Sequence, residues 1–306
     1  MDVLSDVLAA ARLGSVVVGQ NEYLIPWGVE IDIPSAAIVH VVQRGSCWIK
    51  LRGDRSAALL ADGDIVLLPG GAAHSLGDTP RHRAKPFLTV NEQMKRRLSK
   101  LPEGCRDTTA VFCAKYRFEQ VGPHPLLSIL PRFIHVRARE AERHPQLQLL
   151  QQLLRLEARH GGNGKELILP RLVDSLLVYV VRAWLEEQPL RDGGWFGALR
   201  DARIAKALSL MHERPADDWT VASLARAAAQ SRAGFAKRFL EFVGETPLAY
   251  LTRWRMFIAV KMLRDRQRPL GDIAAAVGYE SSAAFSKAFQ RQYSTPPGRF
   301  RAANGE

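Results

Sequence analysis

The sequence predicts a multidomain protein that combines an N-terminal β-barrel, a helical connector and an all-α C-terminal domain. Short strand-like segments alternate with turn signals over the first third of the chain, whereas the last third repeats a two-helix pattern at an offset of 50 residues. At 306 residues, the chain is long enough for two or more domains. We place them at 1–122 for the barrel, 123–194 for the connector and 195–306 for the C-terminal domain.

Strand-like segments of the barrel are rich in β-branched residues and end at turn signals such as Asp62-Gly63-Asp64 and Pro69-Gly70-Gly71. The expected strands are Val16–Val18, Ala37–Val42, Cys47–Leu51, Ile65–Leu68, Phe87–Val90 and Val111–Phe118. After Pro123 the apolar spacing becomes helical, with helices expected over Pro125–Leu130, Gln146–His160 and Glu166–Glu187. These helices form either an internal clasp or a dimerisation surface, and we expect a homodimer through Glu166–Glu187.

Composition narrows the class of protein. A hydrophobic content of 47% supports real cores and excludes a disordered basic chain. The three cysteines are too few for a disulfide scaffold, and their odd number suits a reducing compartment. The start of the chain lacks the basic residues of an export signal, and charges interrupt the apolar stretch Leu172–Leu185. We therefore expect a cytoplasmic protein without a membrane partner.

Positive charge is concentrated in the last third of the chain. The 43 Lys and Arg residues outnumber 31 Asp and Glu residues, giving a net charge of +12. Residues 198–306 hold 18 of the basic residues and 10 of the acidic ones. A basic surface of this kind is either a solvated face or the binding surface of an anionic partner such as nucleic acid.

The 50-residue repeat places equivalent residues at equivalent points of two helical pairs. Phe235 and Phe239 match Phe285 and Phe289, and in each copy the two rings lie on one helix face and are expected to be buried. Ala229 and Gly278 occupy the tight turns, where a small residue or one in the left-handed conformation costs least. Ser231 and Ser281 are the expected N-caps of the second helices.

The outward face of each second helix is polar and small, as in a helix-turn-helix whose second helix enters the major groove of DNA. An ordinary helical bundle is the alternative, but two copies within the most basic region favour double-stranded DNA as the partner. The helix Pro247–Arg264, about 27 Å long, can hold both reading helices about one turn of DNA apart. Expected phosphate contacts are Ser231, Arg253, Arg255, Lys261 and Ser281.

The C-terminal sequence resembles the AraC/XylS family of bacterial transcription regulators. The resemblance covers about residues 198–303 and is closest at 231–239, 246–256, 273–279 and 296–301. It implies RNA polymerase as a partner, and base contacts from early, outward positions of both second helices. With Arg232 on the same face, the expected base contacts are Arg232, Ala233, Ala236, Lys237, Ser282, Ala283 and Lys287. Ser294 departs from the family pattern, which has glycine there.

The N-terminal region is similar to the cupin-type regulatory domain of that family. Gly63 to His74 fits the second cupin signature, whereas His40 stands alone where the first signature has a His-x-His pair and a Glu. A metal-dependent cupin enzyme needs about three protein ligands. We therefore expect no enzyme activity, and a small-molecule effector bound beside His40, Trp48 and His74.

Two alternatives to an effector-controlled regulator stay open: a cupin-type metal enzyme fused to a DNA-tethering domain, and a DNA-binding regulator whose barrel only dimerises. No cofactor is expected, with one exception. Cys105, Cys113, His124 and His135 carry the atom types of a structural zinc site, but their spacing matches no compact zinc motif. Buried cysteines and helix-capping histidines are the ordinary interpretation.

Overall fold

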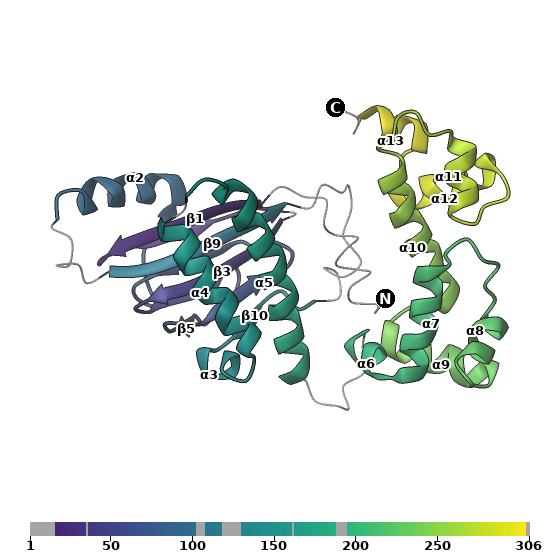
Figure 1. Ribbon diagram of the computed structural model, residues 1–306, viewed down its shortest axis with the longest axis horizontal. Coiled ribbons are helices and arrows are strands. Elements are labelled where there is room, and N and C mark those ends of the chain that lie inside the picture. Colours follow the sequence, from purple (N-terminus) through teal and green to yellow (C-terminus); the bar gives the residue numbers. More distant parts are fainter. Residues whose placement is uncertain are drawn as a thin grey trace. The chain divides into compact units, whose positions relative to one another are not determined.

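The computed structural model describes residues 16–34, 36–101, 108–117, 130–160, 162–187 and 195–303. These residues form two compact units, one built from the described residues between 16 and 187 and one from 195–303 (Figure 1). Both boundaries predicted from the sequence, after residues 122 and 194, adjoin or fall within stretches outside the described residues. The two units are described separately below.

The first unit contains two five-stranded sheets that enclose an apolar core. One sheet has the order β1 (Val16–Leu24), β9 (Thr108–Arg117), β3 (Ala36–Arg44), β6 (Ile65–Leu68) and β10 (Ile134–Val136). The other has the order β5 (Ala58–Leu60), β4 (Cys47–Leu51), β7 (His74–Gly77), β2 (Gly28–Ile31) and β8 (Lys85–Pro86). All pairings are antiparallel except that of β2 with β8. The prediction of a β-rich, barrel-like N-terminal domain is confirmed.

One predicted strand is wrong. Phe87–Val90 forms the first turn of helix α2 (Phe87–Leu98), in which Val90 and Met94, four residues apart, are buried. A four-residue apolar run fits a strand and a helix equally well, because its periodicity cannot be judged over so short a window. The expected strands at the positions of β1, β3, β4, β6 and β9 are confirmed. The helix expected over Pro125–Leu130 lies almost entirely outside the described residues.

Three further helices follow β10: α3 (Ala138–Ala141), α4 (Pro145–His160) and α5 (Lys165–Glu187). Helices α4 and α5 pack side by side in the same unit as the strands, and α5 contacts β1, β6 and β10 (Figure 1). Strand β3 is consequently buried along almost its whole length, because its sheet is covered by the core on one face and by helices on the other. Its sequence therefore reads as a continuous apolar run instead of an alternating one.

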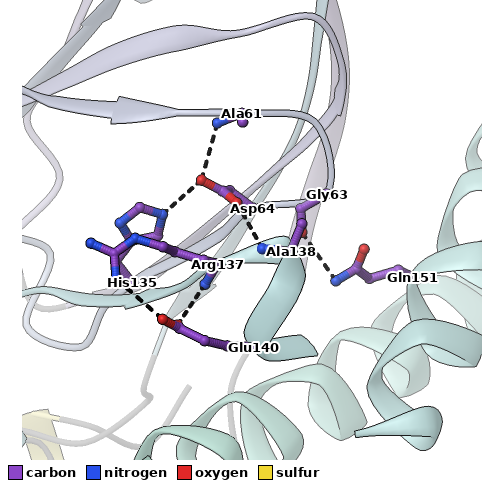
Figure 2. A network of polar contacts seen from close by, with 8 residues as sticks. All are labelled: Ala61, Gly63, Asp64, His135, Arg137, Ala138, Glu140 and Gln151. Atoms are coloured by element: carbon purple, nitrogen blue, oxygen red, sulfur yellow. Dashed lines mark hydrogen bonds and ion pairs between the residues drawn. The ribbon is translucent and has the colours of Figure 1, made fainter. Parts of the chain in front are cut away.

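A polar network joins the turn before β6 to β10 and α3 (Figure 2). The Asp64 carboxylate accepts hydrogen bonds from the Ala61 amide at 3.0 Å, the His135 Nε2 at 2.8 Å and the Ala138 amide at 2.8 Å. Burial alone would raise the pKa of Asp64, but these three hydrogen bonds outweigh it and lower the pKa below its usual value. Gln151 of α4 donates to the Gly63 carbonyl of the same turn.

The second unit is all helical. Its elements are α6 (Trp195–Arg200), α7 (Ala202–Glu213), α8 (Val221–Ala227), α9 (Arg232–Val243), α10 (Pro247–Met262), α11 (Leu270–Ala276), α12 (Ser282–Tyr293) and α13 (Pro297–Ala303). The predicted repeat is confirmed, since α8–α9 and α11–α12 are equivalent helical pairs on either side of α10. None of the described helices in the chain combines the length and the apolar character needed to cross a membrane.

Helices α7 and α10 meet at an aromatic stack. The ring of His212 lies 3.9 Å from that of Trp254 between centroids, and its Nε2 is hydrogen-bonded to the Tyr250 hydroxyl at 2.7 Å. Both partners come from α10, so the stack fixes α7 against the long central helix. Burial lowers the pKa of His212 to about 3, which keeps the ring neutral at physiological pH.

Candidate nucleic-acid interface and barrel pocket

The two helical pairs have the local chemistry of helix-turn-helix motifs. Their turns contain Ala229 at φ 51° and Gly278 at φ 79°, two small residues in the left-handed conformation. Ser231 caps α9 by accepting from the Gly234 amide, and Ser281 caps α12 by accepting from the Ala284 amide, each at 3.2 Å. The cap and the tight turn together fix where each second helix begins.

Buried phenylalanines anchor the inner faces of α9 and α12. All four rings predicted to be core residues are fully buried, with centroids 5.6 Å apart within α9 and 5.7 Å apart within α12. The opposite faces are available to a partner. Of the predicted base-contacting residues, Ala236 is half-buried, and the exposed ones are Arg232, Ala233, Lys237, Ser282, Ala283 and Lys287.

The two outward faces differ in chemistry. Alanine methyl groups on α9 can contact a thymine methyl but cannot donate hydrogen bonds to a base, whereas the serines on α12 can. Lys237 is within 3.9 Å of the Glu241 carboxylate, while the amino group of Lys287 has no ion-pair partner within 4.0 Å among the described residues. The exposed donors on α9 are therefore Arg232 and Lys237, whereas α12 adds serine hydroxyls to Lys287.

Two of the predicted phosphate contacts, Arg253 and Arg255, have partners within their own unit. The Arg253 guanidinium donates to the Glu245 carboxylate, 3.0 Å from its Nε, and lies over the Tyr250 ring. The Arg255 guanidinium donates to three backbone carbonyls of its own unit. Both side chains are partly buried and donate to groups of their own unit, which leaves fewer of their donors available to a phosphate. Burial and the nearby charge of Arg264 lower the pKa of Lys261.

In the barrel, His40 and His74 lie at the centre of a buried hydrogen-bonded chain. Their Nε2 atoms are 2.8 Å apart, His40 Nδ1 is 3.1 Å from Cys113 Sγ, and His74 Nδ1 is 2.7 Å from the Ala72 carbonyl. Because the carbonyl only accepts, His74 Nδ1 carries a proton and its Nε2 accepts from His40 Nε2. His40 Nδ1 then accepts from the Cys113 thiol. All four ring nitrogens are satisfied.

Burial favours the uncharged forms of His40, His74 and Cys113. Burial and the neighbouring His74 ring hold the pKa of His40 well below its usual range, and burial lowers the pKa of His74. Burial also raises the pKa of the Cys113 thiol to about 12. The sequence indicated the two histidines but not Cys113 as their partner, because residues 73 positions apart are brought together by the register of β3 and β9.

A pocket of about 630 Å³ opens beside Cys113. Its wall includes Cys113, whereas the two histidines lie behind Cys113 and do not line it. The surrounding side chains are mainly apolar and come from β1, β2, β9 and the start of α2. The lining residues are Val17, Val18, Gly19, Asn21, Glu30, Ile31, Asp32, Ile33, Ile38, Pro86, Phe87, Leu88, Asn91, Cys113, Ala114 and Lys115.

Trp48, the third residue predicted for an effector site, does not line this pocket. Burial alternates along β4, where Cys47, Ile49 and Leu51 are buried in the core while Trp48 and Lys50 lie on the other face. Side chains of successive strand residues point to opposite faces of a sheet. The sequence showed a tryptophan in a strand but not which face of the sheet it occupies.

The predicted zinc cluster is not assembled by the described residues. Cys113 and His135 lie on strands three positions apart in one sheet, about 14 Å at the usual strand spacing, whereas the ligands of one zinc ion lie within about 2.3 Å of it. These two residues therefore do not share a metal ion. Cys105 and His124 lie outside the described residues. In the described part of the chain, no group of three or more His, Cys, Asp or Glu side chains could hold a metal.

Comparisons with known proteins cover both units. A cupin family profile matches residues 2–186, and a helix-turn-helix domain profile matches residues 224–303. A putative AraC-like transcription regulator of Streptomyces lividans is 33% identical over 98% of each chain, and one of Streptomyces antibioticus is 34% identical over 98% of each chain. The HTH-type transcriptional regulator AlkR of Acinetobacter baylyi is 30% identical over 98% of this chain and 99% of its own.

Proposed function

Since the chain belongs to the AraC-like family of DNA-binding transcription regulators, we propose that it reads two adjacent DNA subsites under the control of a small molecule bound in its barrel pocket. One observation supports the reading of two subsites: α9 and α12 each expose one face, and two fully buried phenylalanines anchor the opposite face of each helix. One chain then enters two successive major grooves, and α10, about 24 Å long, connects the two helical pairs.

The test of DNA reading is selection of duplexes from a random library by the full-length protein. The recovered sequence should contain two short conserved blocks about one helical turn apart. In gel-shift titrations, the affinity for this sequence should exceed that for random DNA by at least about 10³-fold. Affinity should also fall steeply with salt, because several phosphates are neutralised on binding. Failure to enrich any sequence would contradict the proposal.

The pocket supports a mainly apolar effector. Its volume of about 630 Å³ lies within the usual range for small-molecule sites, about 300–1,000 Å³. Tyr23 donates to Asn91, and Asn91 donates to Asn21 at 2.8 Å, which orients the Asn21 amide within the pocket wall. The Asn21 Nδ2 is buried, and its acceptor in the wall is the sulfur of Cys113, which is a weak one. An effector with an apolar body and one carbonyl or hydroxyl oxygen would satisfy that donor.

Filling the pocket tests this site. A side chain at Gly19 has room, because its Cβ would meet only the Asn21 Nδ2 at 3.6 Å. Gly19→Leu should therefore fold normally but abolish the thermal shift that a library of apolar, oxygen-containing compounds produces in the wild type. Gln20→Leu, on the next residue of the same strand, is the matched control and should keep the shift. Equal ligand responses in the two variants would place the effector elsewhere.

We also propose a homodimer, but through α4 in place of the predicted Glu166–Glu187. Helix α5 buries its apolar face within its own unit, whereas α4 exposes a second apolar stripe opposite its buried one. The stripe consists of Leu149, Leu153 and Leu156, whose spacing puts them on one helix face. A second copy of this chain would cover the stripe in the manner of a two-helix seam.

Light scattering after size exclusion tests the dimer. Leu153→Lys should give a monomer at micromolar concentration, because it places a charge in the middle of the stripe. Leu167→Lys, at a more exposed leucine outside the stripe, should leave the mass of the wild-type dimer unchanged. A monomeric wild-type protein, or an unchanged Leu153→Lys dimer, would overturn this part of the proposal.

Three further expectations follow from the family. We propose RNA polymerase as the partner that carries the signal to transcription, the cytoplasm as the place of action, and a barrel that senses without catalysing. The last point is favoured over a cupin-type metal enzyme because all four ring nitrogens of His40 and His74 already have hydrogen-bond partners. Stoichiometric zinc, iron or manganese in untagged protein would support the enzyme instead.

A further inference from the structure

Arg255, near the middle of α10, donates hydrogen bonds to three backbone carbonyls of the second unit, residues 195–303, which is called the DNA-binding unit below. Its Nε donates to the Pro215 carbonyl at 2.6 Å, its Nη2 to the Asp217 carbonyl at 2.9 Å and its Nη1 to the Gly278 carbonyl at 3.4 Å. No carboxylate takes part in these hydrogen bonds. Burial lowers the pKa of Arg255, although the nearby Tyr279 and Asp218 side chains act in the opposite direction.

Two of these carbonyls lie in the loop that enters the first reading motif, and the third lies in the turn of the second motif. Pro215 and Asp217 lie in the segment that leads into α8, the first helix of the first motif. Gly278 forms the turn between α11 and α12 in the second motif. Arg255 is therefore a side chain of the central helix that binds the backbone of this loop and of this turn at once.

The loop that enters the first motif also approaches the turn of the second motif closely at this point. A Cβ added at Gly278 would lie 2.8 Å from the Ala216 carbonyl oxygen and 2.7 Å from Arg255 Nη2, so no larger residue fits there. The Arg255 guanidinium also lies over the Tyr279 ring, 5.9 Å from its centroid. The turn of the second motif is thus clamped between this loop and Arg255.

From this geometry we infer that Arg255 is a positioning residue that sets the distance and angle between the two reading helices. Without it, α9 and α12 would be linked chiefly by packing along α10, and the spacing of the two DNA subsites would be less strictly specified. The planar guanidinium is required because its five donors are arranged in a rigid fork. A lysine keeps the charge but cannot reach three carbonyls in this arrangement. The inference rests on the bipartite DNA reading proposed above.

The experiment combines one substitution with one change in the DNA. Full-length wild type and Arg255→Lys are titrated against the duplex selected by the wild type, and against the same duplex with one base pair inserted between its two subsites. One base pair displaces the second subsite by about 3.4 Å and turns it by about 35°. Arg299→Lys, at an exposed arginine outside this contact, is the matched control.

The wild type and the control should lose about tenfold or more in affinity on insertion, comparable to the cost of a mismatched base pair. Arg255→Lys should bind the native duplex about tenfold more weakly but lose less than about threefold on insertion, because its reading helices adjust to the new spacing. The same insertion penalty in Arg255→Lys and wild type would overturn the inference. So would wild-type affinity of Arg255→Lys for the native duplex, which is the result expected of a phosphate contact.

A second variant guards against misfolding. Arg255→Gln keeps one donor nitrogen without the charge, and it should show the same reduced insertion penalty with an unchanged helical circular dichroism spectrum. If the wild type shows no insertion penalty, the motifs are not rigidly spaced and the inference fails while DNA reading stands. If the wild type selects no sequence at all, the proposed bipartite reading itself fails.

Discussion

The stability of the DNA-binding unit should depend on the protonation of one histidine. His212 is the only histidine among residues 195–306, and its ring is buried between α7 and α10 against Trp254 and Tyr250. Its pKa falls from an ordinary 6.5 to about 3 in the folded protein. Below pH 6.5 the unfolded chain therefore binds a proton that the folded unit does not bind, and stability falls as the pH decreases toward about 3.

The expected size of this effect follows from the two pKa values. Each pH unit between them costs about 1.4 kcal/mol, so the free energy of unfolding should be about 2 kcal/mol lower at pH 5 than at pH 7. In a unit of this size the melting temperature should fall by about 8 °C or more. Asp and Glu side chains contribute little in this window, because their unfolded pKa values lie below it.

Differential scanning calorimetry of the full chain at pH 5, 6 and 7 measures the effect. The matched variant is His212→Phe, which keeps an aromatic ring in the stack but cannot titrate. It should be less stable at pH 7 because it loses the hydrogen bond to Tyr250, yet its DNA-binding unit should show no such loss between pH 7 and pH 5. Equal pH dependence in wild type and variant would refute the reasoning.

Two further changes test other parts of the structure. Asp64→Asn should lower the free energy of unfolding of the barrel unit by about 2–4 kcal/mol, because it removes the charge that accepts three hydrogen bonds. The control Asp62→Asn, at an exposed position, should lower it by less than about 0.5 kcal/mol. Denaturant unfolding measures both values, and equal costs would contradict the role of the hydrogen-bond network. Lys287→Ala should weaken specific DNA binding about tenfold and relax the base preference in one subsite only. Gel-shift titration and a repeated DNA selection measure the two effects. Unchanged affinity and unchanged preference would show that Lys287 does not read bases.

The all-α domain was the part of the structure that the sequence predicted best. Its repeat supplies two aligned copies of each signal, so the sequence alone locates the turns at Ala229 and Gly278 and the caps at Ser231 and Ser281. These features depend on neighbouring residues, and local sequence therefore specifies them. The same locality explains why Phe87–Val90 was misassigned: four apolar residues do not define a period.

Features that depend on distant residues were not predictable in this way. Arg253 and Arg255 look like phosphate ligands in a basic helix, and only the folded unit shows that Glu245 and three carbonyls already occupy them. The partnership of Cys113 with His40 depends on strand register. The sequence predicts a basic helix and a barrel that contains histidines. Only the tertiary structure shows which of those side chains have internal partners and which are exposed.

The most direct test of the bipartite reading is a footprint of the full-length protein on its selected duplex. Hydroxyl-radical cleavage and base-methylation protection should show two protected major-groove segments per chain, on one face of the DNA and about one helical turn apart. Lys287→Ala should weaken protection in only one of them. A single protected segment per chain, or uniform protection along the duplex, would contradict the assignment of both α9 and α12 as reading helices.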